Sequence, residues 1–287
     1  MTLPYDRVMA DRLTEATSER FGHGWRLATP EPLTAPVSYH LDAMRAALGA
    51  PAFAGRVLDA GCGEGVDLAS VVLRDGCRAV GVELSDGGVH TTRARIARTP
   101  AASLVQGNLL ALPFRDGVFD GAYSYGVVHH TTDPAAAVRE IVRTLRPGAR
   151  LLLYVYEDFS DRSLAWRAAL GAVNTVRALV WRLSPRGIRA VCWAMAPFVY
   201  LGCTWPSKHF RWATRFPYPA TQNRSVASLV PDLYDRFAAP IEQRYSRVGA
   251  EALAAQAGLV VRRSAQARGW MVWAEKPEAS ALQTASA

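Results

Sequence analysis

Nine residues, VLDAGCGEG from Val57 to Gly65, place three glycines at every second position behind an aspartate. The run follows an apolar segment and opens a helical pattern, which is the context in which such glycines indicate a nucleotide-binding turn. Glycine also lets the backbone come very close to a ligand. The sequence therefore predicts a ligand at this turn, beside acidic side chains.

The acidic side chains bear on which ligand this is. A dinucleotide fingerprint reads G-x-G-x-x-G, whereas this turn reads G-x-G-x-G. Glu64 and Asp67, in the first turns of the helix, would weaken the attraction of a helix N-terminus for pyrophosphate. S-adenosylmethionine (SAM) brings an ammonium and a sulfonium instead, and Asp59 can face its amino acid end. These residues favour SAM, with a dinucleotide as the alternative.

A further carboxylate supports a nucleoside ligand. Glu83 ends the next strand pattern and follows Gly61 by 22 residues. Nicotinamide-dinucleotide folds use an acidic residue at this place to bind ribose hydroxyls, so Glu83 supports a nucleoside without choosing between SAM and NAD. The alternative for Glu83 is a solvated carboxylate at a strand end.

These residues need a sheet that brings the strand ends together. Apolar segments predict strands at 56–60, 78–84, 102–108, 117–126 and 147–157, with helices at 64–74, 86–98 and 134–145. A helix and two more strands follow from about residue 248. Such alternation predicts an α/β doubly wound sheet of seven strands, mostly parallel.

The motifs on these strands occur in a fixed order: VLDAGCGEG, VGVELS, LVQGNLLALPF, FDGAYSYGVVHHTTDP and VREIVRTLRPGARLLLYVY. In this order they resemble the class I SAM-dependent methyltransferases, which have a Rossmann-like fold, and within them the ubiquinone/menaquinone-biosynthesis (type 11) group. The resemblance covers about residues 55–157 and, more weakly, 248–275. It implies SAM as cofactor and S-adenosyl-L-homocysteine as product.

The resemblance also assigns residues to the cofactor. It implies SAM contacts from the glycine turn, the ribose carboxylate and the adenine edge, namely Asp59, Gly61, Cys62, Gly63, Gly65, Glu83, Leu84, Asn108 and Leu109. Many relatives carry Asp where this chain has Asn108. An amide oxygen can still accept a bond from the adenine amino group, so we expect a weaker contact there.

Catalysis of methyl transfer rests mostly on positioning, because the displacement is in line. A base is needed only where the acceptor must lose a proton. Beyond the carboxyl ends of strands four and five, His129 is the first candidate base, since imidazole titrates near neutrality. The alternative is that the His129–His130 pair shapes the turn before Pro134. Glu157 is a weaker candidate, and Tyr125 is expected to be a wall against SAM more than an acid.

Aromatic residues near these strand ends and at the N-terminus are expected to contact the acceptor. His130 and Tyr156 follow strands four and five. The segment ERFGHGW places Phe21 and Trp25 around two glycines, which favours a lid over the cofactor. The alternative is that these rings pack a helix onto the sheet.

Residues 158–247 interrupt the strand and helix alternation with a basic insertion. They hold thirteen basic and five acidic residues, a net charge of +8 that equals that of the whole chain. Five of the eight tryptophans lie between Arg162 and Arg224, where Asp and Glu are absent. The pattern at 163–183 predicts an amphipathic basic helix. The uncharged stretch 190–203 contains Pro197, and we expect it to be too short and interrupted to span a bilayer.

Three interpretations of the insertion stay open. It is a cap whose tryptophans and Phe198 line an apolar acceptor pocket and whose arginines hold an acidic group. It is a membrane-surface patch that gives access to a lipid-soluble acceptor. Or it is a helical insert whose aromatic residues form its own core.

Bulk properties narrow the class of protein. The first twenty residues carry seven charges and no apolar run, which predicts no signal peptide. The four cysteines lack C-x-x-C spacing, so we expect reduced thiols and no metal site. Tyr-Ser-Tyr-Gly at 123–126 differs from the Asn-Pro-Pro-aromatic tetrad of exocyclic-amine nucleic-acid methyltransferases, so nucleic acid is not the expected partner.

The sequence thus predicts a SAM-dependent methyltransferase acting on a small, lipophilic or anionic molecule, in the cytoplasm or at the membrane surface. The alternatives are an enzyme that uses SAM without methyl transfer, such as a cyclase or decarboxylase, and a non-catalytic SAM-binding membrane module. The expected parts are a helical lid (1–50), a SAM-binding core (51–157), the insertion (158–247), the last core elements (248–276) and a disordered tail (277–287).

Overall fold

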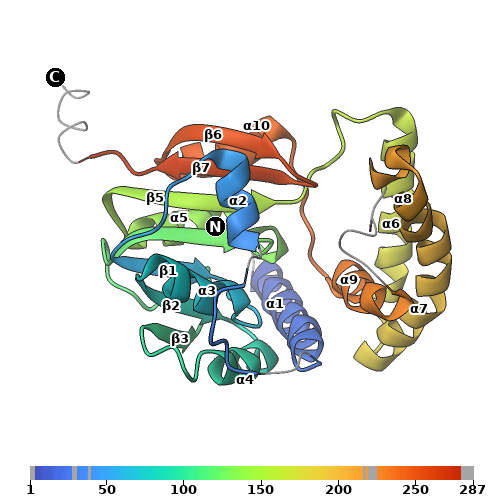
Figure 1. The fold of residues 1–287 in the computed structure, drawn as a ribbon, viewed down its shortest axis with the longest axis horizontal. Coiled ribbons are helices and arrows are strands. Elements are labelled where there is room, and N and C mark those ends of the chain that lie inside the picture. The colour runs from blue at the N-terminus through green and yellow to red at the C-terminus, as the bar shows by residue number, and fades with distance from the viewer. Residues whose placement is uncertain (1–3, 28–30, 38–39, 216–217, 219–224, 279–287) are drawn as a thin grey trace. The chain divides into compact units, whose positions relative to one another are not determined.

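A computed structural model describes residues 4–27, 31–37, 40–215, 218 and 225–278 (Figure 1). The chain divides into two compact units. One, the sheet unit, comprises Met1–Ser163 and Ile241–Ala287, and the other, the helical unit, comprises Leu164–Pro240. The expected disordered tail lies almost wholly outside the described residues.

The sheet unit contains a seven-stranded sheet in the order β3-β2-β1-β4-β5-β7-β6 (Figure 1). Its strands are β1 (Arg56–Ala60), β2 (Arg78–Glu83), β3 (Ala102–Gln106), β4 (Phe119–Tyr125), β5 (Leu145–Val155), β6 (Val260–Gln266) and β7 (Trp270–Glu275). The first five strands pair in parallel, and β7 runs antiparallel to both neighbours. The predicted fold class is confirmed. The strand order reverses between β1 and β4, the place where open α/β sheets bind ligands beyond the carboxyl ends.

Helices cover both faces of this sheet. They are α1 (Pro4–Trp25), α2 (His40–Leu48), α3 (Val66–Asp75), α4 (Asp86–Arg95), α5 (Pro134–Thr144) and α10 (Arg247–Gln256), with a short 3-10 helix, η1 (Val128–His130). Apolar side chains of α2 and α3 form one core with the sheet, and those of α5 and α10 form the other. Two helices begin where the sequence supplies a cap, because Ser85 accepts a bond from Gly88 and Asp133 accepts one from Ala136.

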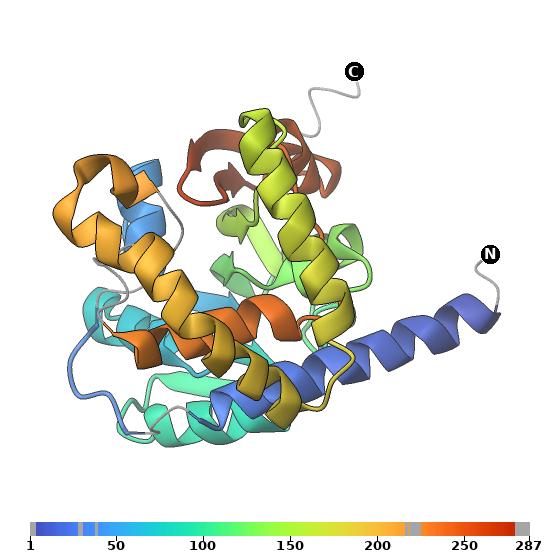
Figure 2. The ribbon, with the colours of Figure 1, turned by 90° about the vertical axis from the view of Figure 1, so that its right-hand side faces the viewer.

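The helical unit consists of α6 (Leu164–Val180), α7 (Pro185–Val199), a π-turn (η2, Tyr200–Thr204), α8 (Trp205–His209), a 3-10 turn (η3, Arg211–Arg215) and α9 (Val226–Ala238). Its core joins Ile188, Cys192 and Ala196 of α7 to one face of α9. Figure 2 shows α6 and α7 in front of α9.

One expectation about this unit is wrong. Pro197 does not interrupt the helix, since a helix of 25 residues runs from Pro185 to His209. By length and composition alone, this helix is long and apolar enough to cross a membrane. Proline removes one backbone bond, here to the carbonyl of Trp193, a residue on the exposed side of α7. The π-turn accommodates Pro206, because the Trp205 N–H bonds to Tyr200, five residues back.

Candidate active site

The glycine turn, Gly61–Gly65, joins β1 to α3. Its three glycines all have positive φ, at 92°, 54° and 79°. A Cβ on Gly61 would lie 2.4 Å from the side chain of Val127, and one on Gly63 would lie 3.1 Å from the ring of Trp25. No other residue fits Gly61, because both its conformation and its surroundings exclude a side chain.

Glu83 ends β2 with a carboxylate that is only 8% exposed. Its Oε2 accepts a bond from the Gly63 N–H at 3.1 Å, and its Oε1 accepts bonds from the Ser85 N–H and hydroxyl at 2.9 and 2.6 Å. Burial raises the pKa of Glu83, and these donors oppose the rise. The carboxylate is thus tied directly to the glycine turn, and it is not the solvated strand end considered as the alternative.

Asp59 lies in β1, just before the turn, and is 3% exposed. The Tyr123 hydroxyl donates a hydrogen bond of 2.8 Å to its Oδ2. Burial raises the pKa of Asp59 well above its usual 3.8, and the nearby Asp67 and Glu83 raise it further. No basic side chain among the described residues pairs with Asp59 or Glu83. Two buried acids therefore flank the turn with uncompensated negative charge when ionised.

The other two acids at the turn have protein partners. Arg95 of α4 forms an ion pair of 2.9 Å with Glu64, and its Nε donates to the Glu64 carbonyl. Asp67 accepts from the His40 ring at 3.1 Å and from the Leu41 N–H. Glu64 and Asp67 thus bind α4 and α2. Only Asp59 and Glu83 are left to repel a pyrophosphate at the turn.

The remaining predicted cofactor residues lie close to Glu83, with different environments. The Gly107 N–H donates to the Glu83 carbonyl at 3.0 Å, which places Asn108 beside the end of β2, where Leu84 lies. Asn108 Oδ1 already accepts a bond from the Leu110 N–H. The side chains of Cys62 and Leu109 are buried in the two cores, so only their backbones can face a ligand. Burial raises the pKa of the Cys62 thiol well above its usual value.

Helix α1 ends against this turn. A Cβ on Gly22 would lie 3.0 Å from Ser85, and Thr91 of α4 donates to the Trp25 carbonyl at 3.0 Å. The Trp25 ring packs on Gly63, and the Phe21 ring centroid lies 5.0 Å from that of His130. The two aromatic residues predicted for the N-terminal segment thus contact the glycine turn and the segment after β4.

A chain of rings follows the carboxyl ends of β4 and β5. Seven aromatic rings contact one another in a continuous series, which we call the ring cluster: His40, Tyr125, Tyr154, Tyr156, His129, His130 and Phe21. Tyr125 stacks between His40 and Tyr154, with centroids 4.0 and 4.2 Å away. Burial raises the pKa of Tyr125 to about 12, so its hydroxyl stays protonated. A raised pKa makes the hydroxyl a weaker acid, so this environment suits a wall better than an acid catalyst.

His129 lies inside the ring cluster and is fully buried. Within the described residues, neither ring nitrogen has a hydrogen-bond partner. Burial, with His130 and Arg244 nearby, lowers the pKa of His129 well below 6.5. Its imidazole is neutral at neutral pH and holds an available lone pair.

Glu157 has a different environment from the one a base requires. It is 5% exposed, and its carboxylate binds Arg162 at 3.1 Å and the Gln266 amide at 2.6 Å. Its backbone also joins β5 to Tyr245 through an isolated bridge. The bonds from Arg162 and Gln266 to this carboxylate hold the segment after β5 in place.

One predicted residue lies elsewhere, and two residues of the ring cluster were not predicted. Phe198 lies in the helical unit and is 78% exposed. His40 and Tyr154 were not predicted. Tyr154 was recoverable, because residues two apart on a strand face the same side and Tyr156 was already a candidate. Nothing in the pattern around His40 indicates its contact with Tyr125.

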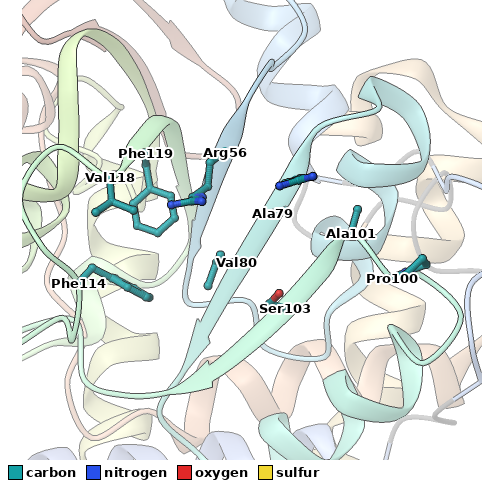
Figure 3. Close-up of a pocket in the computed structure, with 10 residues that line it drawn as sticks. Arg56, Ala79, Val80, Pro100, Ala101, Ser103, Phe114, Val118 and Phe119 are labelled. Carbon is teal, nitrogen blue, oxygen red and sulfur yellow. The ribbon is translucent and has the colours of Figure 1, made fainter.

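A groove in the sheet unit lies away from these residues (Figure 3). Its lining includes Arg56 and Arg78, the first residues of β1 and β2, with Phe114 and Val118. It therefore opens at the amino ends of the strands, opposite the glycine turn. Within the described ranges, His, Cys, Asp and Glu side chains form no group of three that could hold a metal ion.

Comparisons with known proteins agree with this geometry. Residues 58–153 match the methyltransferase domain family. The chain is similar to 24-methylenesterol C-methyltransferase 2 of Oryza sativa (34% identity, covering 38% of this chain and 30% of that one). It is also similar to the demethylmenaquinone methyltransferase of Symbiobacterium thermophilum (35% identity, covering 33% and 40%).

Among solved structures, a SAM-dependent methyltransferase from Methanosarcina mazei matches with a TM-score of 0.47 and 17% identity, over 78% of this chain and 92% of that one. The chain spans about a third of the length of the curated relatives it matches. The match with the family lies on β1 to β5, where the glycine turn, Glu83 and the ring cluster are found. Over residues 58–153 the chain carries a class I SAM-dependent methyltransferase domain of the type 11 group.

Proposed function

We propose that this protein transfers a methyl group from SAM to a small molecule whose apolar part lies against the ring cluster. One observation carries the proposal. Two buried carboxylates, Asp59 and Glu83, flank the glycine turn at the ends of adjacent strands, and the ring cluster begins at the next strand, β4. This arrangement combines a site for a cationic nucleoside with an apolar site beside it.

The turn fits SAM by the chemistry of its donors and acceptors. Glu83 would bind the ribose hydroxyls and Asp59 the amino acid end, with Leu84 and Asn108 at the adenine edge. Burial raises the pKa of both carboxyls, so a cationic ligand stabilises their ionised forms where a pyrophosphate would not. SAM, when bound, supplies a methyl group already activated on a cationic sulfur.

The ring cluster supports an apolar, ring-containing acceptor. The rings of Tyr125 and Tyr156 would lie beside the acceptor, and Phe21 and Trp25 of α1 would close over the cofactor and the acceptor. The relatives that act on a sterol and on demethylmenaquinone, by their names, agree with such an acceptor. Aromatic rings of this kind exclude water and orient the molecule, which is the main requirement of an in-line transfer.

His129 is the residue that we propose to take a proton where the acceptor loses one. Its imidazole is neutral because burial lowers its pKa, and its nitrogens have no partner among the described residues. A group of this kind accepts a proton only when the acceptor hydroxyl or carbon lies within hydrogen-bond reach. Glu157 and Tyr125 are assigned to holding the site, because the first is bound to Arg162 and the second stays protonated.

Calorimetric titration with SAM and with its demethylated product tests the cofactor site. We expect Glu83→Gln and Asp59→Asn each to weaken SAM binding at least ~10-fold, since a lost hydrogen bond to a charged group costs about 1.5–3 kcal/mol. The control is Asp86→Asn, an exposed acid three residues after Glu83. Unchanged affinity in both site variants would remove SAM from this turn.

Methyl transfer itself is tested with methyl-labelled SAM and a panel of demethylated quinones, sterols and phenols. Label on an acceptor, with equal release of S-adenosyl-L-homocysteine, supports the proposal. SAM consumption without label transfer would favour an enzyme of the same fold that does not methylate.

A further inference from the structure

The helix Pro185–His209 of the helical unit presents two different faces. Toward α9 it buries Ile188, Cys192 and Ala196, which have no exposed surface. On the opposite side it exposes large apolar side chains and a proline, and we call this side the α7–α8 face: Trp193, Pro197, Phe198, Leu201 and Trp205. Phe198 is 78% exposed and Leu201 is 63% exposed. Exposed apolar side chains gathered on one helix face mark an interaction surface.

The α7–α8 face lies in an uncharged run with basic residues at both ends. All 18 residues from Ala190 to Ser207 are uncharged. Arg186 and Arg189 precede the run, and Lys208 and Arg211 follow it. Tryptophans and basic residues beside an apolar helix face are typical of helices that lie in the interface of a bilayer.

Charge separates the helical unit from the rest of the chain. Leu164–Pro240 contains ten basic and two acidic residues, and the remaining sequence contains 23 of each, so the helical unit holds the entire net charge of +8. From Arg162 to Pro231 there is no acidic residue. A surface of one sign over this length attracts an anionic partner, and anionic lipid adds about 1 kcal/mol for each basic residue near the surface.

We propose that the α7–α8 face docks the protein on the surface of an anionic lipid bilayer, with Phe198 and Leu201 inserted among the lipids and the flanking arginines on the headgroups. The helix lies in the plane of the interface. It does not span the bilayer, because its second face is already packed on α9 and would have to leave that core. A bilayer fits better than a protein partner. Protein surfaces usually mix charges of both signs, whereas an anionic bilayer is negative throughout and complements the basic helical unit.

Sedimentation of the full-length protein with vesicles tests this proposal without any requirement for SAM. We expect binding to vesicles of phosphatidylcholine and phosphatidylglycerol, and little binding to phosphatidylcholine alone. Raising the salt concentration tenfold weakens the binding, because basic residues at the bilayer surface are screened within a Debye length. Equal binding to both vesicles, or none to either, would overturn the proposal.

Two variants locate the binding surface. Phe198→Ser with Leu201→Ser removes the inserted side chains, and Arg186→Gln with Arg211→Gln removes a charge at each end of the helix. Each double variant is expected to need at least ~10-fold more anionic lipid for half-binding. The control is Val248→Ser, a 75% exposed apolar residue in the sheet unit, which keeps wild-type binding.

A third measurement separates docking from insertion across the bilayer. Protein that docks at the interface is released from vesicles by alkaline carbonate. Retention after carbonate would mean that Pro185–His209 spans the bilayer, and binding that persists in Phe198→Ser with Leu201→Ser would place the lipid site elsewhere. Either result contradicts the proposal, and neither bears on methyl transfer.

Discussion

The Tyr123 hydroxyl donates a hydrogen bond of 2.8 Å to the carboxylate of Asp59, and both side chains are buried beneath the glycine turn. The two residues lie on neighbouring strands, β4 and β1, where they form a register pair. This bond lowers the pKa of Asp59, whereas burial and the neighbouring acids raise it. The donor thus reduces the cost of ionising Asp59 in this buried position.

Tyr123→Phe should destabilise the protein in a pH-dependent way. The folded-state pKa of Asp59 is raised above 3.8, so Asp59 ionises in the unfolded chain at a lower pH than in the folded protein. The free energy of unfolding therefore falls as the pH rises past 3.8, and it stops falling above the folded-state pKa. Without the hydroxyl this pKa rises further. We expect a loss of about 1.5–3 kcal/mol in the free energy of unfolding at about pH 8 and a smaller one at about pH 5.

Urea unfolding at both pH values measures this effect, and Ser124→Ala is the control. Ser124 is equally buried and donates to the Ala60 carbonyl, a group that does not ionise. Its loss should cost the same at both pH values. A pH-independent loss in Tyr123→Phe would mean that Asp59 does not ionise in the absence of ligand.

His129 should make the protein less stable in mild acid. Its folded-state pKa is well below 6.5, so the unfolded chain binds a proton that the folded protein excludes. The contribution of His129 to the free energy of unfolding is fully present above pH 6.5. It falls as the pH drops toward the folded-state pKa, with a slope of up to about 1.4 kcal/mol per pH unit. His129→Phe keeps a ring beside Tyr156 and should lack this slope.

The comparison is made by urea unfolding from about pH 7.5 down to about pH 5. The control variant is His90→Asn, because His90 is an exposed histidine of α4. That variant should keep the wild-type slope. The same slope in His129→Phe would show that His129 accepts a proton within the folded state, which would weaken its assignment as a neutral base.

Gly61→Ala tests the packing of the glycine turn, and Gly76→Ala is its matched control. Both glycines have positive φ, at 92° and 67°. A Cβ at Gly76 meets nothing within 4 Å, whereas one at Gly61 meets Val127 at 2.4 Å. Gly76→Ala should cost about 1 kcal/mol from backbone strain alone. Gly61→Ala should cost more, by the overpacking term of about 1–3 kcal/mol, and should also weaken SAM binding.

Removal of the obstructing side chain completes this test. The double variant Gly61→Ala with Val127→Ala should recover part of the stability lost in Gly61→Ala, measured by urea unfolding. Partial recovery is expected because alanine removes the two Val127 methyl groups at 2.4 and 2.5 Å but keeps the Val127 Cβ at 2.8 Å. No recovery would assign the loss to the backbone conformation at Gly61 together with the Val127 Cβ.

The sheet and the cofactor turn were predictable because their signals are local. Alternating apolar and helical patterns placed β1 to β5 within a few residues, and the spacing of Gly61 and Glu83 marked the two strand ends that meet at the turn. Helix caps such as Ser85 and Asp133 are also predictable from the neighbouring sequence, since each residue directly precedes the helix that it caps. These features depend on residues close together in the chain.

The features that escaped prediction depend on distant contacts. Glu64 pairs with Arg95, 31 residues away, and Asp67 pairs with His40, 27 residues away, so both acids have protein partners that the local pattern did not indicate. Pro197 stays within a helix because the helix packs on α9 and leaves Trp193 exposed. Tertiary packing decides such cases, and it overrides the local preference of a proline to end a helix.

Glu157 should prove structural, although its position after β5 is one where a catalytic base would be sought. Its buried carboxylate binds Arg162 and Gln266, so Glu157→Gln and Arg162→Gln should each lower the free energy of unfolding by about 1.5–3 kcal/mol. The double variant should lose less than the sum, because both changes break one interaction. Arg262→Gln, at the exposed pair with Glu275, is the control and should cost about 1 kcal/mol or less. Methyl transfer by Glu157→Gln, measured under conditions where the variant is folded, should keep the pH dependence of the wild type. A lost acidic limb in that profile would make Glu157, and not His129, the base, because a base must lose its proton before it can act.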